Sequence, residues 1–262
     1  MFKTSTALNA TVATIGLLLT ASPGWSGDAL LPDLRTVVPQ HVQLVNAQQR
    51  EIVRFSNGIA NTGAGQWRMR PRFPLPGDTT QTQDAIQELF DAAGNVVEQK
   101  VVSQFVFHPE HNHWHIGDVA LFEIRVGSPT GPIYGQNSLK TTFCLIDWYR
   151  LVGNSPTTDR VFVDCQAKSP YQGISPGWVD QYHQELEGQS LDITGAPVGT
   201  YYLVSTSNPA GVFIESDYSN NTAWVSFALT RESNGNPKIA ITGHSPVPAN
   251  LPGLDGEGAP NR

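Results

Sequence analysis

Apolar and polar residues alternate along several short stretches of the chain, which is the pattern of half-buried β-strands. In residues 119–126 every second residue from Ala120 onward is apolar. Glu123 and Arg125 fall between them and point to the opposite face. The other runs that predict strands are 50–55, 85–91, 96–107, 199–205 and 222–229. Residues 92–95, Ala-Ala-Gly-Asn, predict the turn of a β-hairpin between the second and third of these runs.

Turn-forming residues separate these runs, and no stretch has the 3.6-residue apolar period of a helix longer than about two turns. The 24 glycines and 19 prolines fall mostly between the apolar runs. Residues 145–185 show little periodicity of any kind. Short strands joined by turn clusters are typical of β-sandwiches. The sequence therefore predicts an all-β protein with a β-sandwich core and long functional loops.

The N-terminus has the pattern of a secretory signal peptide. Lys3 precedes an apolar stretch at about residues 7–20, and small residues follow it. A membrane anchor is the alternative, but the stretch is short and polar for a membrane span. We therefore predict a signal peptide at residues 1–26, a secreted or periplasmic protein, and no stable insertion in a membrane.

Charge and cysteine content narrow the range of partners and compartments. The formal net charge is −7, and no cluster of lysine and arginine stands out. Because a nucleic-acid-binding surface needs such a cluster, the composition argues against nucleic acid as a partner. Export to an oxidising compartment favours a disulfide between the two cysteines, Cys144 and Cys165. Two buried free thiols are the alternative.

Four of the seven histidines lie in residues 108–115, HPEHNHWH. His111, His113 and His115 alternate, so an extended backbone would place them on one face, where a modest twist or bulge brings all three to one ion. Three imidazoles leave positions open for water, oxygen or substrate, as a catalytic metal site requires. Imidazole suits copper and zinc alike. For His108 the sequence leaves three roles open: a fourth ligand, a partner of a ligand, or a surface residue.

Five distinctive sequence blocks follow one another along the chain. They are HPEHNHWHIGD at 108–118, KTTFCLID at 140–147, GISPGWVDQY at 173–182, LDIT at 191–194 and ESDYSNN at 215–221. In this order they resemble the lysyl oxidase family, whose copper-binding region has the form His-x-x-His-x-His-x-His followed closely by Asp. The resemblance extends over about residues 31–229, most of the mature chain.

The resemblance implies a copper- and quinone-dependent amine oxidase. In the family a lysine and a tyrosine of these blocks join to form lysine tyrosylquinone, and by motif the pair here is Lys140 and Tyr182. The three alternating histidines would bind the copper. The implied reaction converts a primary amine, either peptidyl lysine or a small amine, to an aldehyde. Molecular oxygen is consumed, and ammonia and hydrogen peroxide are released. Asp180, two residues before Tyr182, is a candidate general base.

The last block is rich in the oxygen ligands that suit a hard cation such as calcium. In the lysyl oxidase family this block and an N-terminal Pro-Asp-Leu form a calcium site. By match, the predicted ligands are Asp33, the backbone carbonyl of Leu34, Glu215, Asp217, Asn220 and Asn221. A polar turn that closes a hairpin is the alternative.

Departures from the family pattern leave other functions open. The chain has only two cysteines, and Trp178 stands where animal members have Cys. The main alternative function is a secreted copper-binding β-sandwich without catalytic activity. A third is a zinc hydrolase with Glu110 as its general base. We predict a lysyl oxidase-like catalytic domain at residues 27–230 and a partly flexible C-terminal extension at residues 231–262.

Overall fold

A computed structural model describes residues 29–135, 142–151, 155–165 and 171–254. These residues form sixteen β-strands and contain no helix, and the strands within each sheet pair antiparallel. The prediction of an all-β protein is confirmed. The predicted signal peptide lies outside the described residues. Within the described part of the chain, no helix is long and apolar enough to cross a membrane.

A six-stranded sheet is built around the long strand β3, which pairs with β1, β2, β12 and β13. The strands are β1 (Leu34–Thr36), β2 (Gln40–Ala47), β3 (Arg50–Asn61), β10 (Tyr149–Arg150), β12 (Trp178–Tyr182) and β13 (Ser190–Asp192). The β2–β3 hairpin turns through Gln48 and Gln49, whose φ angles are 52° and 63°. Two left-handed residues in a two-residue turn match the twist of the flanking strands.

A second sheet holds the predicted hairpin between residues 85–91 and 96–107. Its strands, in spatial order, are β11 (Gln172–Ile174), β4 (Trp67–Pro71), β5 (Gln83–Phe90), β6 (Val96–His108) and β7 (His113–Ile116). The β5–β6 turn is closed by Asp91, whose carboxylate accepts the N–H groups of Ala93 and Asn95. Gly94 supplies the left-handed residue with a φ of 83°. The hairpin prediction is confirmed.

The third sheet is formed largely by the C-terminal half of the chain. Its strands, in spatial order, are β16 (Pro237–His244), β15 (Thr222–Arg231), β14 (Gly199–Ser207), β8 (Ala120–Val126) and β9 (Ile133–Tyr134). The predicted strands at 119–126, 199–205 and 222–229 correspond to β8, β14 and β15. β16 lies within the predicted C-terminal extension and pairs with β15 over its whole length. The domain boundary at residue 231 stays a prediction.

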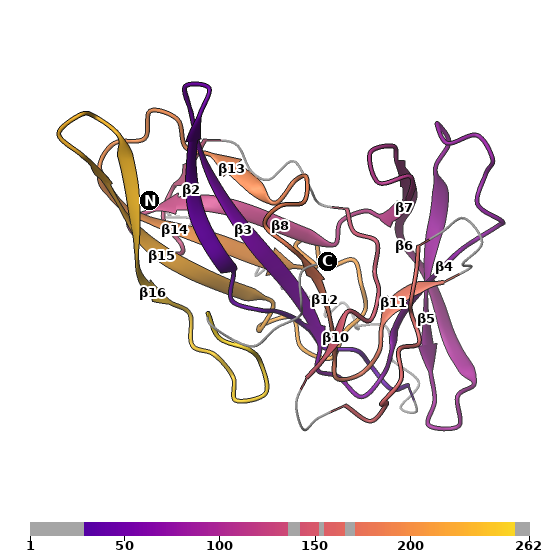
Figure 1. Cartoon of the computed structure of the whole chain (residues 1–262). Coiled ribbons are helices and arrows are strands. Elements are labelled where there is room, and N and C mark those ends of the chain that lie inside the picture. The colour runs from indigo at the N-terminus through magenta and orange to yellow at the C-terminus, as the bar shows by residue number, and fades with distance from the viewer. Residues whose placement is uncertain (1–28, 136–141, 152–154, 166–170, 255–262) are drawn as a thin grey trace, which may run out of the picture.

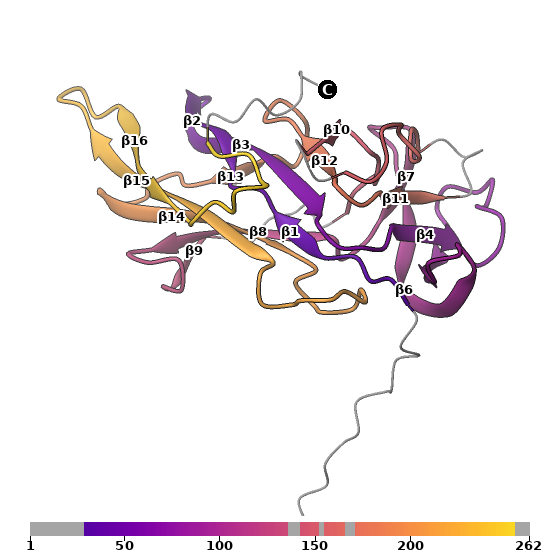
Figure 2. The ribbon, with the colours of Figure 1, turned by 90° about the horizontal axis from the view of Figure 1, so that it is seen from below.

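The first and third sheets face each other (Figures 1 and 2). Buried apolar side chains from both form a core between them. Phe55 of β3 and Phe122 of β8 are fully buried, and their rings meet edge-to-face at 4.9 Å. Burying one such side chain stabilises the fold by about 1.5–3 kcal/mol. The second sheet lies at the other end of the molecule from β16 and joins the same core cluster through Trp67, which packs on Phe213 at 5.0 Å.

Candidate metal centre

A tight turn between β6 and β7 brings the histidines together. β6 ends at His108, which pairs with His113 at the start of β7. Within the turn, the N–H of His111 donates to the carbonyl of His108 at 3.2 Å, and Asn112 has a left-handed φ of 54°. Asn tolerates this conformation better than most residues. The prediction of one extended segment is therefore wrong for His111, which reaches the other two imidazoles from the turn.

The donor atoms of His111, His113 and His115, called the histidine triad below, all lie within 4.8 Å of one another. His115 Nε2 is 3.0 Å from His113 Nε2 and 3.3 Å from His111 Nδ1. Neighbouring ligands on an ion with bonds of about 2.0–2.1 Å are about 2.9–3.4 Å apart. The distances from His115 Nε2 to the other two nitrogens are therefore those of neighbouring ligands around one ion. His115 is fully buried, whereas His111 and His113 are partly exposed.

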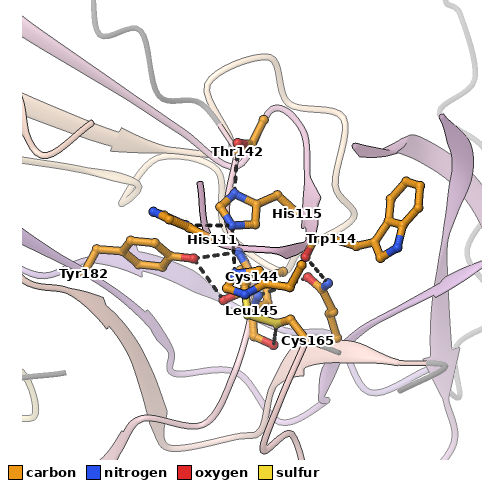
Figure 3. Close-up of a disulfide and its surroundings, with 10 residues drawn as sticks. His111, Trp114, His115, Thr142, Cys144, Leu145, Cys165 and Tyr182 are labelled. Carbon is orange, nitrogen blue, oxygen red and sulfur yellow. Dashed lines mark hydrogen bonds between the residues drawn. A yellow bond between two sulfur atoms is a disulfide. The ribbon is translucent and has the colours of Figure 1, made fainter. Parts of the chain in front are cut away.

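Thr142 contacts His115 from the side opposite the other imidazoles (Figure 3). Its Oγ1 lies 3.2 Å from His115 Nδ1. If Nδ1–H donates to this hydroxyl, Nε2 remains the acceptor nitrogen that faces His111 and His113. A polar partner that fixes the ring and its tautomer is common for histidine ligands. Thr142 belongs to the block that begins at Lys140, and Lys140 itself lies outside the described residues.

Tyr182 is buried beside the triad at the end of β12 and is 1% exposed. Its ring stands edge-on to His115, with centroids 6.4 Å apart, and edge-on to Phe143 at 4.5 Å. The hydroxyl accepts the N–H of Cys144 at 2.7 Å and lies 3.3 Å from the Cys144 carbonyl, to which it donates (Figure 3). These contacts fix the phenol next to the buried member of the triad.

Cys144 and Cys165 form the predicted disulfide, and their Cα atoms are 5.8 Å apart. The alternative of two free thiols is wrong. The bond closes a loop with a sequence separation of 21. In the loop-entropy account it stabilises the fold by about 3 kcal/mol. Because Cys144 also holds the Tyr182 hydroxyl, the disulfide restrains the backbone that positions the tyrosine.

Asp147 is a buried residue to which the sequence analysis gives no role. Its carboxylate accepts four hydrogen bonds of 2.7–3.2 Å, from the N–H groups of Val161, Phe162 and Ser175 and from the Ser175 hydroxyl. It therefore ties three loop segments together through both of its carboxylate oxygens. Asp147 closes the KTTFCLID block, and that position was the one signal of its importance.

Gln172 connects the loop segments to β7. Its Nε2 donates to the carbonyl of Trp114 at 2.6 Å, and its Oε1 accepts the N–H of Leu145 at 3.2 Å. Trp114 lies between two residues of the triad, so Gln172 supports the backbone that carries them. An isolated glutamine has no distinctive sequence pattern, so the sequence alone does not predict this role.

His108 lies against the triad without sharing its group of donor atoms. Its ring stacks on that of His115 with centroids 4.7 Å apart and is 4.3 Å from the ring of His111. His108 Nδ1 is 3.5 Å from a carboxylate oxygen of Glu110, whose side chain is 63% exposed. Glu110 thus contacts His108 and is not among the described residues that gather with the triad, which gives no support to the zinc hydrolase alternative.

The predicted calcium ligands form a second polar cluster, called the carboxylate–amide cluster below. It comprises Asp33, Glu215, Asp217, Asn220 and Asn221. Glu215 is buried and accepts hydrogen bonds from the Leu34 N–H at 2.9 Å and from the side-chain amide of Asn221 at 2.7 Å. The amide of Asn220 donates to Asp33 at 2.9 Å and to Asp217 at 3.0 Å. Residues far apart in sequence are thus brought together.

This cluster has more oxygen acceptors than hydrogen-bond donors. The amide oxygens of Asn220 and Asn221 are buried and have no hydrogen-bond partner among the described residues. Burial raises the pKa of the Glu215 carboxyl, the amides of Asn208 and Asn221 oppose this shift, and the nearby charge of Asp33 adds to it. The Leu34 carbonyl accepts the Ser207 hydroxyl at 2.8 Å. Surplus amide oxygens beside the three carboxylates of the cluster fit the ligand preferences of calcium.

The chain is similar in sequence to known proteins. A sequence model of the family described as Lysyl oxidase matches residues 91–235, more than half of the chain. Over 115 residues, 44% of this chain, it is 34% identical to Protein-lysine 6-oxidase from Sus scrofa and 31% identical to Lysyl oxidase homolog 1 from Homo sapiens. The matches cover 43% and 19% of those two relatives. The chain belongs to the lysyl oxidase family.

Proposed function

We propose that the chain is a copper- and quinone-dependent amine oxidase that converts primary amines to aldehydes. The net reaction is R-CH2-NH2 + O2 + H2O → R-CHO + NH3 + H2O2, so the amine carbon is oxidised and oxygen is reduced. The observation that supports this function is the buried phenol of Tyr182, fixed edge-on to His115 of the histidine triad. Holding a metal ion would not by itself require a tyrosine there.

The triad fits copper in ligand type and spacing. Three imidazole nitrogens suit copper or zinc, and His111, His113 and His115 would hold the ion. Thr142, at 3.2 Å from His115 Nδ1, would keep the opposite nitrogen available to the metal. Copper bound there would supply the redox chemistry that matures a quinone, which then takes electrons from the substrate amine.

Lys140 and Tyr182 are the proposed precursors of lysine tyrosylquinone. The contacts of Tyr182 with Cys144 and Phe143 keep its ring in one orientation and exclude water from one side. Asp180 is two residues earlier on β12 and therefore faces the same side of the strand, and it is 1% exposed. We assign it the role of the general base, which takes a proton from the carbon next to the substrate amine.

We further propose a secreted or periplasmic protein that uses peptidyl lysine or a small amine as its substrate. The disulfide suits an oxidising compartment, and Protein-lysine 6-oxidase is the name of a relative that matches 44% of this chain. In the carboxylate–amide cluster, calcium would be held by Asp33, Glu215, Asp217, Asn220 and Asn221, with the Leu34 carbonyl as the predicted backbone ligand. Calcium there would tie the N-terminal strand β1 to the segment before β15.

Peptide mapping of the full chain, expressed with copper in air, tests the proposal. The expected result is a cross-linked peptide that joins Lys140 to Tyr182 and gains mass after treatment with phenylhydrazine, which reacts with quinone carbonyls. Tyr182→Phe should bind copper normally and show neither the cross-link nor the mass gain. Amine oxidation, followed as hydrogen peroxide release, should be lost in the same variant.

One outcome would favour the main alternative, a secreted copper-binding protein without activity. In that case a fully copper-loaded, aerated sample would contain unmodified Lys140 and unmodified Tyr182. Normal amine turnover by Tyr182→Phe would also contradict the proposed cofactor. Tight binding of zinc together with hydrolytic activity would favour the zinc hydrolase.

A further inference from the structure

A second group of metal-binding side chains lies beside the histidine triad. The donor atoms of His108, His111 and Glu187 all lie within 4.8 Å of one another. The two histidines are partly exposed and Glu187 is exposed, so this group is more open to solvent than the triad with its buried His115. His108 Nδ1 is itself buried; it makes no hydrogen bond with the described residues, and a carboxylate oxygen of Glu110 lies 3.5 Å away.

We propose that His108, His111 and Glu187 form a second position for a divalent cation, the entry position, from which the metal passes to the triad. Two imidazoles and one carboxylate are a ligand set that suits zinc and copper ions. His111 belongs to both groups. A metal that moves from one group to the other therefore stays beside this imidazole while it exchanges its other ligands. The proposal rests on the histidine triad being the metal centre.

The geometry favours entry from this side. The ring of His108 stacks on that of His115 with centroids 4.7 Å apart, so the two positions are neighbours. A hydrated dication loses much solvation energy when it moves to a buried site with neutral ligands. The carboxylate of Glu187 offsets part of this cost, because it partly neutralises the ion before the buried His115 replaces the remaining water.

Glu187 also lies in the loop that follows β12, whose last residue is Tyr182. The loop is held by hydrogen bonds from the Leu186 N–H to the His183 carbonyl at 2.9 Å and from the Gln189 N–H to the Leu186 carbonyl at 3.3 Å. The entry position therefore joins the β6–β7 turn to the loop after the tyrosine. A metal held there would draw the two segments together.

The rate of metal uptake tests the entry position. Full-length, metal-free protein without a histidine tag is mixed rapidly with Cu²⁺, and quenching of tryptophan fluorescence is followed, since Trp114 lies between His113 and His115. Glu187→Gln should load about 10-fold more slowly, the lower end of the change in association rate when an opposite charge beside the path of an ion is lost. Its final stoichiometry and affinity should equal those of the wild type. Glu185→Gln, an exposed acid in the same loop, should load at the wild-type rate.

A second experiment separates this proposal from the proposed function. In the double variant His113→Ala/His115→Ala the triad is removed, and one Cu²⁺ should still bind with lower affinity, measured by equilibrium dialysis. Adding Glu187→Gln should weaken this residual binding by at least about 10-fold, since the loss of a ligand costs no less than the loss of an outer partner. If the double variant does not fold, His113→Ala alone serves as the background.

Two results would overturn the entry position. One is an equal rate of copper uptake by the wild type and Glu187→Gln, and the other is a residual copper affinity in the double variant that Glu187→Gln does not change. Neither result would contradict the assignment of copper to the histidine triad. Failure of the wild type to bind copper tightly, with residual binding still dependent on Glu187, would overturn both the proposed function and the entry role, and would leave only a separate metal site at His108, His111 and Glu187.

Discussion

The histidine triad and the carboxylate–amide cluster are both partly buried and polar, yet they are assembled in opposite ways. The triad comes from one short turn, and its nitrogens face one another at 3.0 and 3.3 Å. The cluster combines Asp33 with residues 215–221, and its amide N–H groups already occupy the carboxylates. What remains in the cluster is a surplus of amide oxygens.

The difference indicates what a bound ion does in each place. In the triad the nitrogens point at one another, so a metal bound there would accept all three imidazoles as ligands at once. In the cluster the negative charges have hydrogen-bond donors of their own, and a cation would add bonds to a structure that is already formed. We therefore expect the triad to control activity and the cluster to control stability.

Removing one imidazole should have the largest effect. His113→Ala should lower copper affinity by at least about 100-fold, the upper end of the loss from an outer partner, and should abolish amine oxidation. Competition with a copper chelator measures the affinity. His244→Ala, which removes a histidine on β16, is the matched control and should bind copper like the wild type. Unchanged affinity in His113→Ala would remove this residue from the metal site.

Asp147 is a buried carboxylate whose hydrogen bonds come from the protein itself and need no cation. Asp147→Asn places an amide NH2 against backbone N–H groups and should lower the free energy of unfolding by about 3 kcal/mol, since buried donors lose their acceptor. Urea denaturation measures this change. The loss should be the same in calcium and in chelator. Asp159→Asn, which changes an exposed residue of the same loop region, should leave the free energy of unfolding unchanged. If calcium restored the stability of Asp147→Asn, the distinction between this carboxylate and the carboxylate–amide cluster would be wrong.

The pH dependence of stability at Glu215 tests whether the carboxylate–amide cluster binds a cation. Burial raises its pKa, so without calcium the folded state keeps this proton to a higher pH than the unfolded state. Its contribution to stability is then complete below the ordinary value of 4.5 and is lost as pH rises through the raised value. Calcium at about 100 times its Kd should instead stabilise the ionised form by about 2.7 kcal/mol.

The melting temperature of wild type minus that of Glu215→Gln measures this effect from acid to neutral pH. In chelator the difference should fall as pH rises, and in calcium it should rise. The same slope in both conditions would mean that the cluster is a plain polar turn, the alternative that the sequence leaves open.

The smallest expected effect lies outside both regions. Gln49→Gly should stabilise the protein by about 0.5 kcal/mol, because glycine adopts the left-handed φ of 63° without a clash but has more freedom when unfolded. Thermal melting in calcium and in chelator should show the same shift. Ala47→Gly, on the neighbouring strand, should destabilise, and stabilisation by both variants would contradict the turn assignment.

The alternation of apolar and polar residues predicted the strands that have one face in the core and one toward solvent. The β5–β6 hairpin and strands β8, β14 and β15 belong to this group. The sequence analysis does not predict β2 or β16, since both have mostly exposed or half-exposed residues on either face. β16 is an edge strand paired with β15, so its backbone hydrogen bonds stabilise it where no apolar pattern is needed.

The candidate site was predictable where its residues are close in sequence. Histidine spacing indicates the triad, although the turn at His111 was not foreseen. The roles of Asp147 and Gln172 depend on partners such as Ser175 and Trp114, which the fold brings from distant parts of the chain. No local pattern encodes such contacts. The family blocks therefore indicated that these regions matter, but not which contacts Asp147 and Gln172 make.

The sequential order of β4, β5, β6 and β7 has a consequence for how the protein is made. These strands are neighbours both along the chain and in the sheet, so they close short loops and should form early during folding. Tyr182 arrives only after the disulfide loop has been synthesised. A growing chain can thus present its imidazoles to a metal before the phenol is in place, and we expect copper loading to precede burial of the tyrosine.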